Sequence, residues 1–259
     1  KKNQNLKVFE LENEIAVVNA GVGSAIAGKK TMVGTSGGGF DLMTEALSLC
    51  GMAEVPLVFY LAQRPGPSTG LATYTGQGDL NMARHAGHGE FSRLLIAPGD
   101  SLECEELISQ AFYFSQKYQI PSIVISYKHL AESFFTLDEK PKITPSKILT
   151  KLGRYNSYEK DPKTGSATED AEIIKKNVEA RNKKRDEIKK ETLNFEQFKI
   201  YGNKNSKNLI VSWGSTKGAI LDSISKLNNV KFIQVLYLEP FTKKLKQEFK
   251  ELGILEIIN

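Results

Sequence analysis

The stretch from Gln63 to Thr73 gathers several residue types that could do chemistry. It contains the string Gln-Arg-Pro-Gly-Pro-Ser-Thr-Gly, and Gly76-Gln77-Gly78-Asp79-Leu80 follows shortly after it. The apolar run 56–62 just before it is typical of a buried central strand. Open α/β sheets place their ligand sites beyond the carboxyl ends of such strands. Arg64, on a loop stiffened by Pro and Gly, is therefore predicted to bind a carboxylate rather than to be a surface arginine on an ordinary turn.

A glycine-rich turn, Thr35-Ser36-Gly37-Gly38-Gly39-Phe40, lies between a predicted strand and a predicted helix. Such a turn exposes backbone N–H groups and lets a ligand approach closely. It is not a P-loop, because it lacks the Gly-Lys-Ser/Thr ending. Another glycine-containing run, Gly21 to Gly28, lies inside a predicted helix. It therefore indicates close helix packing rather than dinucleotide binding.

Two further clusters carry ionisable groups. Glu12-Asn13-Glu14-Ile15-Ala16 opens a helix, where acidic residues are favoured by the helix dipole whatever else they do. His85-Ala86-Gly87-His88-Gly89-Glu90 could serve proton transfer, although a structural or interface role is the alternative that we favour.

The elements that must position these residues alternate along the first 135 residues. Short β-branched runs and helical stretches follow one another, which predicts a parallel sheet with helices on both faces. Gly28 is placed to end the first helix in a left-handed conformation. Strands are expected at 7–10, 30–35, 56–62, 93–97 and 122–126, and helices at 12–27, 40–52 and 101–118.

The composition changes after residue 135. Residues 136–207 are rich in polar and charged side chains and predict a connector with one long helix at 168–190. A second α/β pattern begins at 208, with strands expected at 209–211, 232–236 and 254–258 and helices at 215–227 and 242–252. Because the last strand coincides with the end of the sequence, we expect this domain to be incomplete. The predicted fold is thus α/β, with a parallel-sheet domain at 1–135, a connector at 136–207 and an incomplete α/β domain at 208–259.

Composition narrows the class of protein. The 259 residues are 40% hydrophobic and 25% charged, as in soluble proteins of one large or two ordinary domains. No apolar run is long enough to cross a bilayer and the start has no signal-peptide pattern, so a cytoplasmic location is expected. Two cysteines and three histidines offer no metal-site spacing. The net charge of +5 is concentrated at 175–190, which indicates a solvated helix face rather than a nucleic-acid site.

Together these motifs resemble those of the α subunits of 2-oxoacid:ferredoxin oxidoreductases, especially the 2-oxoglutarate and broad-specificity branch. The string that begins at Gln63 is the most specific part. The resemblance covers most of residues 8–135 and 208–259. It includes the motifs at 12–16, 35–40, 43–47, 86–90, 214–219 and 237–241.

The resemblance implies a thiamine diphosphate enzyme that oxidatively decarboxylates 2-oxo acids to acyl-CoA, CO2 and reduced ferredoxin. Residues 1–135 would be its pyrimidine-binding domain, without the first strand–helix unit, and 208–259 the start of a transketolase C-terminal-like domain. Glu14, with Glu12 as the lesser candidate, would hold N1′ of the aminopyrimidine and favour the tautomer that forms the reactive ylide. Near the aminopyrimidine the resemblance places Ser36, Gly37, Gly38 and Phe40. Around the substrate it places Arg64, Pro67, Ser68, Thr69 and Gly70.

Several elements of the family are absent from this sequence. A Tyr-Pro-Ile-Thr-Pro-Ser substrate segment, a Gly-Asp-Gly…Asn motif for diphosphate and Mg²⁺, and a cluster-binding cysteine motif are not found. The resemblance assigns Mg²⁺ and the 4Fe–4S cluster to a partner β subunit, and coenzyme A binding to a γ subunit or domain. We therefore expect a truncated, cropped or split chain that is active only with partners, including ferredoxin.

Two alternatives stay open at this point. The chain could be a non-catalytic paralogue that kept the fold as a partner-binding scaffold, which loss of the substrate segment favours and retention of Glu14 and Arg64 disfavours. It could also be half of another thiamine enzyme, such as a transketolase-like protein or a decarboxylase, which the string at Gln63 disfavours.

Overall fold

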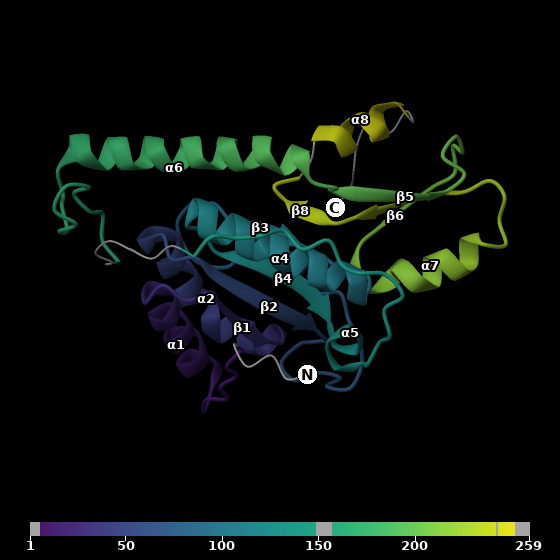
Figure 1. Ribbon diagram of the computed structural model, residues 1–259, viewed down its shortest axis with the longest axis horizontal. Coiled ribbons are helices and arrows are strands. Elements are labelled where there is room, and N and C mark those ends of the chain that lie inside the picture. Colours follow the sequence, from purple (N-terminus) through teal and green to yellow (C-terminus); the bar gives the residue numbers. More distant parts are fainter. Residues whose placement is uncertain (1–5, 149–156, 242, 252–259) are drawn as a thin grey trace.

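A five-stranded sheet forms the centre of the first part of the molecule (Figure 1). The computed structural model describes residues 6–148, 157–241 and 243–251. The strand order is β1-β2-β4-β3-β8, with all neighbours parallel except the antiparallel β3–β8 pair. The strands are β1 (Thr31–Thr35), β2 (Leu57–Gln63), β3 (Leu94–Ile96), β4 (Ser122–Tyr127) and β8 (Tyr237–Glu239). This arrangement confirms the predicted α/β class with a parallel sheet.

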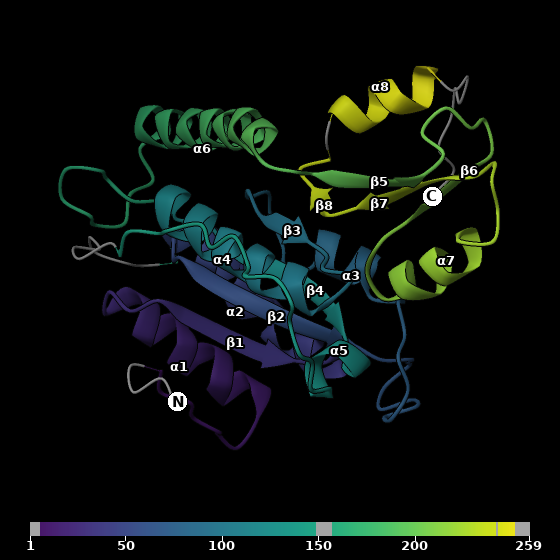
Figure 2. The same ribbon diagram turned by 45° about the vertical axis from the view of Figure 1, so that its right-hand side comes forward.

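Helices cover both faces of this sheet because side chains alternate along each strand. Leu57, Phe59 and Leu61 of β2 belong to a core shared with α1 and α2, whereas Val58 belongs to a core shared with α4. Figure 2 shows α4 on one side of the strands and α2 behind them. The helices of this part are α1 (Glu14–Ile26), α2 (Gly37–Ala53), α3 (Leu80–His85), α4 (Ser101–Tyr118) and α5 (Lys128–Glu132).

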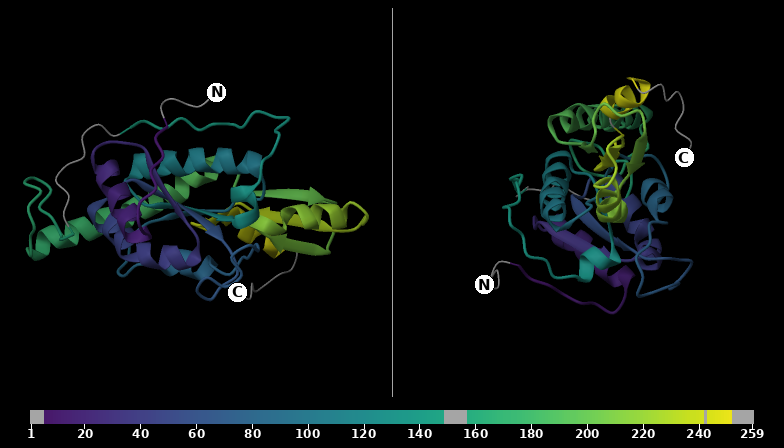
Figure 3. Two further views of the ribbon diagram at one scale, coloured as in Figure 1. Left: turned by 90° about the horizontal axis from the view of Figure 1, so that it is seen from below. Right: turned by 90° about the vertical axis from the view of Figure 1, so that its right-hand side faces the viewer.

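A second, three-stranded sheet extends beside the first one (Figure 3, left). Its order is β5-β7-β6, with β5 antiparallel and β6 parallel to β7. The strands are β5 (Phe198–Gly202), β6 (Leu209–Ser212) and β7 (Lys231–Val235). The accompanying helices are α6 (Ala171–Glu191), η1 (Thr192–Asn194), η2 (Gly214–Thr216), α7 (Lys217–Ile224) and α8 (Lys243–Glu251). One strand of this sheet, β5, comes from the range predicted as a connector, and β8 returns to the first sheet.

Most predicted elements are found within a few residues of their expected bounds, but one is wrong. Residues 7–10 were expected as a strand and form no regular structure. Lys7, Val8 and Phe9 are exposed, so this segment has no neighbour strand to satisfy its backbone. The strand expected at 254–258 lies outside the described residues. Within the described part of the chain, no helix is both long and apolar enough to cross a membrane.

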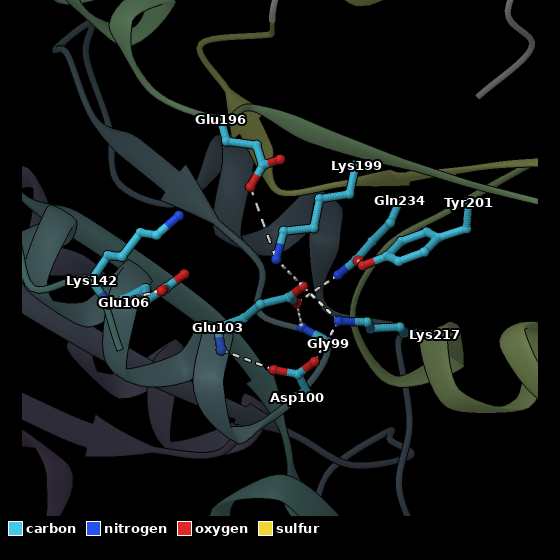
Figure 4. Close-up of polar contacts among 10 residues, drawn as sticks. All are labelled: Gly99, Asp100, Glu103, Glu106, Lys142, Glu196, Lys199, Tyr201, Lys217 and Gln234. Carbon is cyan, nitrogen blue, oxygen red and sulfur yellow. Dashed lines mark hydrogen bonds and ion pairs between the residues drawn. The ribbon is translucent and has the colours of Figure 1, made fainter. Parts of the chain in front are cut away.

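A buried ion cluster joins the two sheets (Figure 4). Glu103 of α4 is almost fully buried, and its Oε1 accepts from Lys217 Nζ at 2.6 Å and Lys199 Nζ at 2.9 Å. Its Oε2 accepts from Gln234 Nε2 at 2.7 Å and from the backbone N–H of Gly99 at 2.8 Å. Both carboxylate oxygens therefore have donors from the second sheet and its helix, and Oε2 also has one from the loop before α4. We call these residues, together with Asp100, the Glu103 cluster.

The charges within the Glu103 cluster compensate one another. Lys217 also pairs with Asp100, whose other carboxylate oxygen accepts from the Glu103 N–H at 2.9 Å. Burial alone would disfavour the charged forms, but these contacts outweigh it: the pKa of Asp100 is lowered and the pKa of Lys217 is raised. Asp100 and Lys217 thus stay ionised at neutral pH, and their pair fixes the start of α7 against the start of α4.

Candidate functional site

The candidate site lies at the carboxyl edge of the first sheet. The strands β2 and β4 end there in register at Gln63 and Tyr127, and β1 ends at Thr35, which pairs with Leu61 of β2. The glycine-rich turn follows β1 directly, and the loop that carries Arg64 follows β2. Parallel strands thereby bring two motifs that are distant in sequence to one edge, which is where such sheets bind ligands.

Glu14 enters this edge as the first residue of α1. Asn13 caps that helix, its side-chain oxygen accepting from the Ala16 N–H at 2.9 Å. Glu14 Oε1 accepts a long hydrogen bond from Thr35 Oγ1 at 3.4 Å. Glu14 is half-buried, whereas Glu12 is exposed. The structure therefore holds Glu14, and not Glu12, against the end of β1.

Gly39 is needed for Glu14 to lie where it does. A Cβ on Gly39 would come within 2.0 Å of Thr35 Oγ1 and 2.5 Å of Glu14 Oε1. Any larger residue would displace the carboxylate from the first turn of α2. The amino-terminal end of this helix also favours a negative charge, through its dipole and its free N–H groups.

Asp79 approaches the same turn from the other side. A Cβ on Gly37 would meet Asp79 Oδ2 at 2.9 Å, so glycine again allows a carboxylate to come close. Asp79 Oδ2 is buried and has no hydrogen-bond partner among the described residues. Burial, and secondarily the Asp41 carboxylate, raise the pKa of Asp79 above its usual value. This side chain can therefore hold or accept a proton more readily than an ordinary aspartate.

The loop after β2 closes on itself. Pro65 O accepts from the Leu71 N–H at 3.0 Å, and a Cβ on Gly70 would lie only 1.9 Å from that oxygen. Gly70 has a φ of 51°, a conformation that also favours glycine. Pro67, Ser68, Thr69 and Gly70 are exposed on the outside of this loop. Arg64 is half-buried, and its Nε is buried without a hydrogen-bond partner in the described chain.

Two glutamines hold the loop in place. Gln63 is buried, donates to Ser126 O at 2.9 Å and accepts from the Asp79 N–H at 3.1 Å. Gln77 donates to Trp213 O at 2.9 Å and accepts from Ser215 Oγ at 2.5 Å. The loop is thus anchored at one end to β4 and at the other to η2. The helix α7, which begins with Lys217 of the Glu103 cluster, follows η2 directly.

The residues predicted from the sequence are only partly brought together. Glu14 contacts the turn at Gly39, and a Cβ on Gly38 would lie 3.8 Å from Ser68 O. Ser36 precedes α2 without a side-chain cap. Phe40 is buried and packs edge-on against Phe59, so its side chain belongs to the core. No direct contact joins Arg64 to Glu14 among the described hydrogen bonds and ion pairs.

Three residues of this edge, Thr35, Asp79 and Gln77, were not among those predicted to act. Thr35 and Asp79 belong to the motifs quoted from the sequence, and their positions at a strand end and before a helix were the available signal for a role. The contact of Gln77 with η2 spans 136 and 138 residues in sequence, and no local pattern could indicate it.

The histidine motif packs against the second half of α2. Ser48 Oγ donates to His88 O at 2.7 Å and lies 3.1 Å from His88 Nδ1. Ser48 lies roughly 13 Å along the helix from Gly39. These contacts support a structural role for His88. No group of His, Cys, Asp and Glu side chains in the described ranges could hold a metal ion.

A family model described as pyruvate flavodoxin/ferredoxin oxidoreductase, thiamine diphosphate-binding, matches residues 1–202. The chain belongs to this family. It is 34% identical to subunit alpha of 2-oxoacid:ferredoxin oxidoreductase 1 from Sulfurisphaera tokodaii, over 97% of this chain and 45% of the relative. It is also 34% identical to the 2-oxoglutarate synthase subunit KorA of Archaeoglobus fulgidus, over 60% of this chain and 42% of that one.

A solved structure of this kind has the same fold. It is the 2-oxoglutarate:ferredoxin oxidoreductase from Magnetococcus marinus with 2-oxoglutarate, coenzyme A and succinyl-CoA bound. The TM-score is 0.76 at 25% identity, over 94% of this chain and 48% of that chain. The predicted relationship to 2-oxoacid:ferredoxin oxidoreductase α subunits is thereby confirmed. The chain spans about half the length of the curated relatives it matches.

The residues at the carboxyl edge fit thiamine diphosphate. The cofactor's aminopyrimidine needs a carboxyl group at one ring nitrogen and a backbone surface that a flat ring can approach. Glu14 is a half-buried carboxyl group at this edge that could meet the first need. Gly38, exposed and with no atom closer than 3.8 Å to a Cβ built on it, leaves room at the adjacent turn. The carboxyl edge thus offers both a carboxyl group and an open backbone surface, as the aminopyrimidine requires.

Proposed function

We propose that this chain supplies the α portion of a thiamine diphosphate-dependent 2-oxoacid:ferredoxin oxidoreductase. The reaction is the oxidative decarboxylation of a 2-oxo acid to acyl-CoA and CO2, with reduction of ferredoxin. One observation carries the proposal: Glu14 is held against Gly39 at the carboxyl edge, where Arg64 and Asp79 keep buried polar atoms that have no partner among the described residues. The names of the relatives from S. tokodaii and A. fulgidus support it.

In this proposal Glu14 holds the pyrimidine ring of the cofactor, and Ser36, Gly37 and Gly38 contact it through the backbone of the turn. Bound thiamine diphosphate supplies the carbon nucleophile and the electron sink that decarboxylation of a 2-oxo acid requires. Phe40 contributes by packing: against Phe59 it fixes the first turn of α2. Glu14 acts by sharing a proton at the ring nitrogen, and the dipole of α2 keeps its carboxylate in place.

Arg64 is the proposed partner of the substrate carboxylate. Its guanidinium can offer a planar fork of N–H donors, and its buried Nε has no competing acceptor in the described chain. Pro67, Ser68, Thr69 and Gly70 shape the outer wall of this pocket. Asp79 lies between this loop and the glycine turn, where its raised pKa suits it to hold a proton near the reacting groups.

The remaining parts of the reaction belong to partners in this proposal. A β subunit holds the diphosphate, Mg²⁺ and a 4Fe–4S cluster, and a γ subunit or domain binds coenzyme A. The Glu103 cluster and the second sheet then keep the α portion in one arrangement while these chains assemble on it. The proposal includes a cytoplasmic location.

The experiment that tests this function uses the complex co-purified with the natural full-length version of this chain. Reduction of a viologen dye is measured with 2-oxoglutarate or pyruvate, with and without coenzyme A. Dye reduction that needs both the 2-oxo acid and coenzyme A is the expected result, and the better acid defines the substrate. No reduction, with thiamine diphosphate and a cluster-bearing partner demonstrably present, would point instead to a non-catalytic scaffold.

A further inference from the structure

A hollow of about 280 Å³ lies between α3, the loop before β3, α6 and β8. It opens at the end of α3 opposite Asp79 and is not used by the proposed reaction. Drug-sized ligands occupy roughly 300–1,000 Å³, so this hollow suits a smaller molecule or a single chemical group. The ionisable residues that line it are Arg84, His85, Glu90, Arg93, Arg181, Arg185 and Glu239.

The lining has an excess of positive charge. Four guanidinium groups face only two carboxylates, Glu90 and Glu239. Arg84 reaches Glu239 at 3.8 Å, close to the limit of an ion pair. Arg181 pairs with Glu159, which is not part of the lining. Arg185 is exposed on α6 and forms no ion pair within the described residues.

The two deeper arginines lack sufficient partners. Arg84 Nε is buried and has no hydrogen-bond partner in the part of the chain that the structure describes. Arg93 donates to Ala83 O at 3.1 Å, and its guanidinium lies 4.4 Å from the centre of the Phe91 ring. Burial lowers the pKa of Arg93 to about 10, and Glu239 only partly offsets this effect. Both side chains are partly buried, and a cation that is withdrawn from water without adequate compensation is costly unless an anion pairs with it.

We propose that this hollow binds a phosphate group, either free inorganic phosphate or the phosphate of a small phosphoester. A guanidinium presents parallel N–H donors that match phosphate oxygens, and arginine is preferred where such paired hydrogen bonds are made. Arg84 lines the hollow with a guanidinium that Glu239, at 3.8 Å, only weakly occupies, and Arg185, which also lines it, can add a second fork. This site is separate from the carboxyl edge and does not depend on the function proposed for it.

The test is a calorimetric titration, in which a phosphate compound is added to the complex that contains the natural full-length chain. One arm uses inorganic phosphate and the other uses methyl phosphate, so that binding of free phosphate and of a phosphoester are distinguished. Saturable binding in either arm is expected. Lack of saturable binding in both arms overturns the proposal, including the case in which a partner's acidic segment already fills the hollow.

Two variants and one control locate the binding. Arg84→Gln and Arg185→Gln should each raise the dissociation constant about tenfold or more, the scale of one lost hydrogen bond between charged groups. Lys183→Gln is the matched control, because Lys183 lies on the same helix, is 80% exposed and does not line the hollow. It should change binding less than about twofold. Because Arg185 is exposed, its replacement should not unfold the chain, and Arg185→Gln therefore tests the phosphate site even if Arg84→Gln does not fold. Unchanged binding in Arg185→Gln would overturn the assignment.

Discussion

The Glu103 cluster and the carboxyl edge handle buried polar groups in opposite ways. In the cluster, each oxygen of Glu103 accepts from two donors, and the lysines balance the carboxylates. At the carboxyl edge, Arg64 Nε and Asp79 Oδ2 are buried with no partner in the described chain. An unsatisfied buried group costs about 1–3 kcal/mol, so a fold tolerates it where a ligand completes it. The first region therefore maintains the architecture, and the second is the one that we propose to bind cofactor and substrate.

The largest effect is expected from a substitution that removes a partner within the Glu103 cluster. Lys217→Met should lower the free energy of unfolding of the full-length chain by roughly 3–5 kcal/mol, because it removes a partner from a buried carboxylate. Urea unfolding, followed by circular dichroism, measures this change. Lys183→Met, on the exposed face of α6, should cost less than about 0.5 kcal/mol. Equal stability of the two variants would mean that the cluster does not hold the sheets together.

The next largest effect is expected at the carboxyl edge, where the substitution should leave the stability of the fold unchanged. Arg64→Lys should raise the KM for the 2-oxo acid about tenfold, because one ammonium group cannot reproduce a planar fork. Steady-state dye reduction by the assembled complex measures it. Arg185→Lys provides the control on a distant helix. A KM that stays at the wild-type value in Arg64→Lys would place the carboxylate site elsewhere.

The smallest effect concerns the connection between the two regions. Gln77→Leu removes the hydrogen bonds to Trp213 and Ser215, and should lower kcat/KM about fivefold, the scale of a net hydrogen bond. Ser215→Ala removes one of the same two contacts. Because the residues interact directly, the double variant should lose less activity than the two single losses combined. Fully additive losses would show that η2 does not position the loop.

Much of the fold could be predicted because local patterns determine it. The helix expected at 101–118 has those bounds in the structure, with Asp100 capping it. The second sheet was predicted less well. The strand β5 is neither long nor strongly apolar, and its partner β7 lies about 30 residues further on, so pairing rather than pattern creates it.

The candidate site could be predicted only where its motifs are contiguous. The glycine turn and the Arg64 loop were recognised from sequence. The contact of Gly37 with Asp79 and that of Gln77 with Ser215 join segments from different parts of the chain. The arginine-lined hollow could not be predicted either, because its lining residues come from α3, the loop before β3, α6 and β8.

The most direct test of the central claim is the exchange of the thiazolium proton of thiamine diphosphate in the assembled complex, followed by NMR. Glu14→Gln should slow this exchange by at least ~10²-fold, the scale of a lost acid–base group. The matched control is Glu12→Gln, because Glu12 is exposed and lies two residues away. It should leave the exchange unchanged. Near-normal exchange in Glu14→Gln, with the cofactor bound, would contradict the assignment of Glu14 and with it the proposed role of this edge.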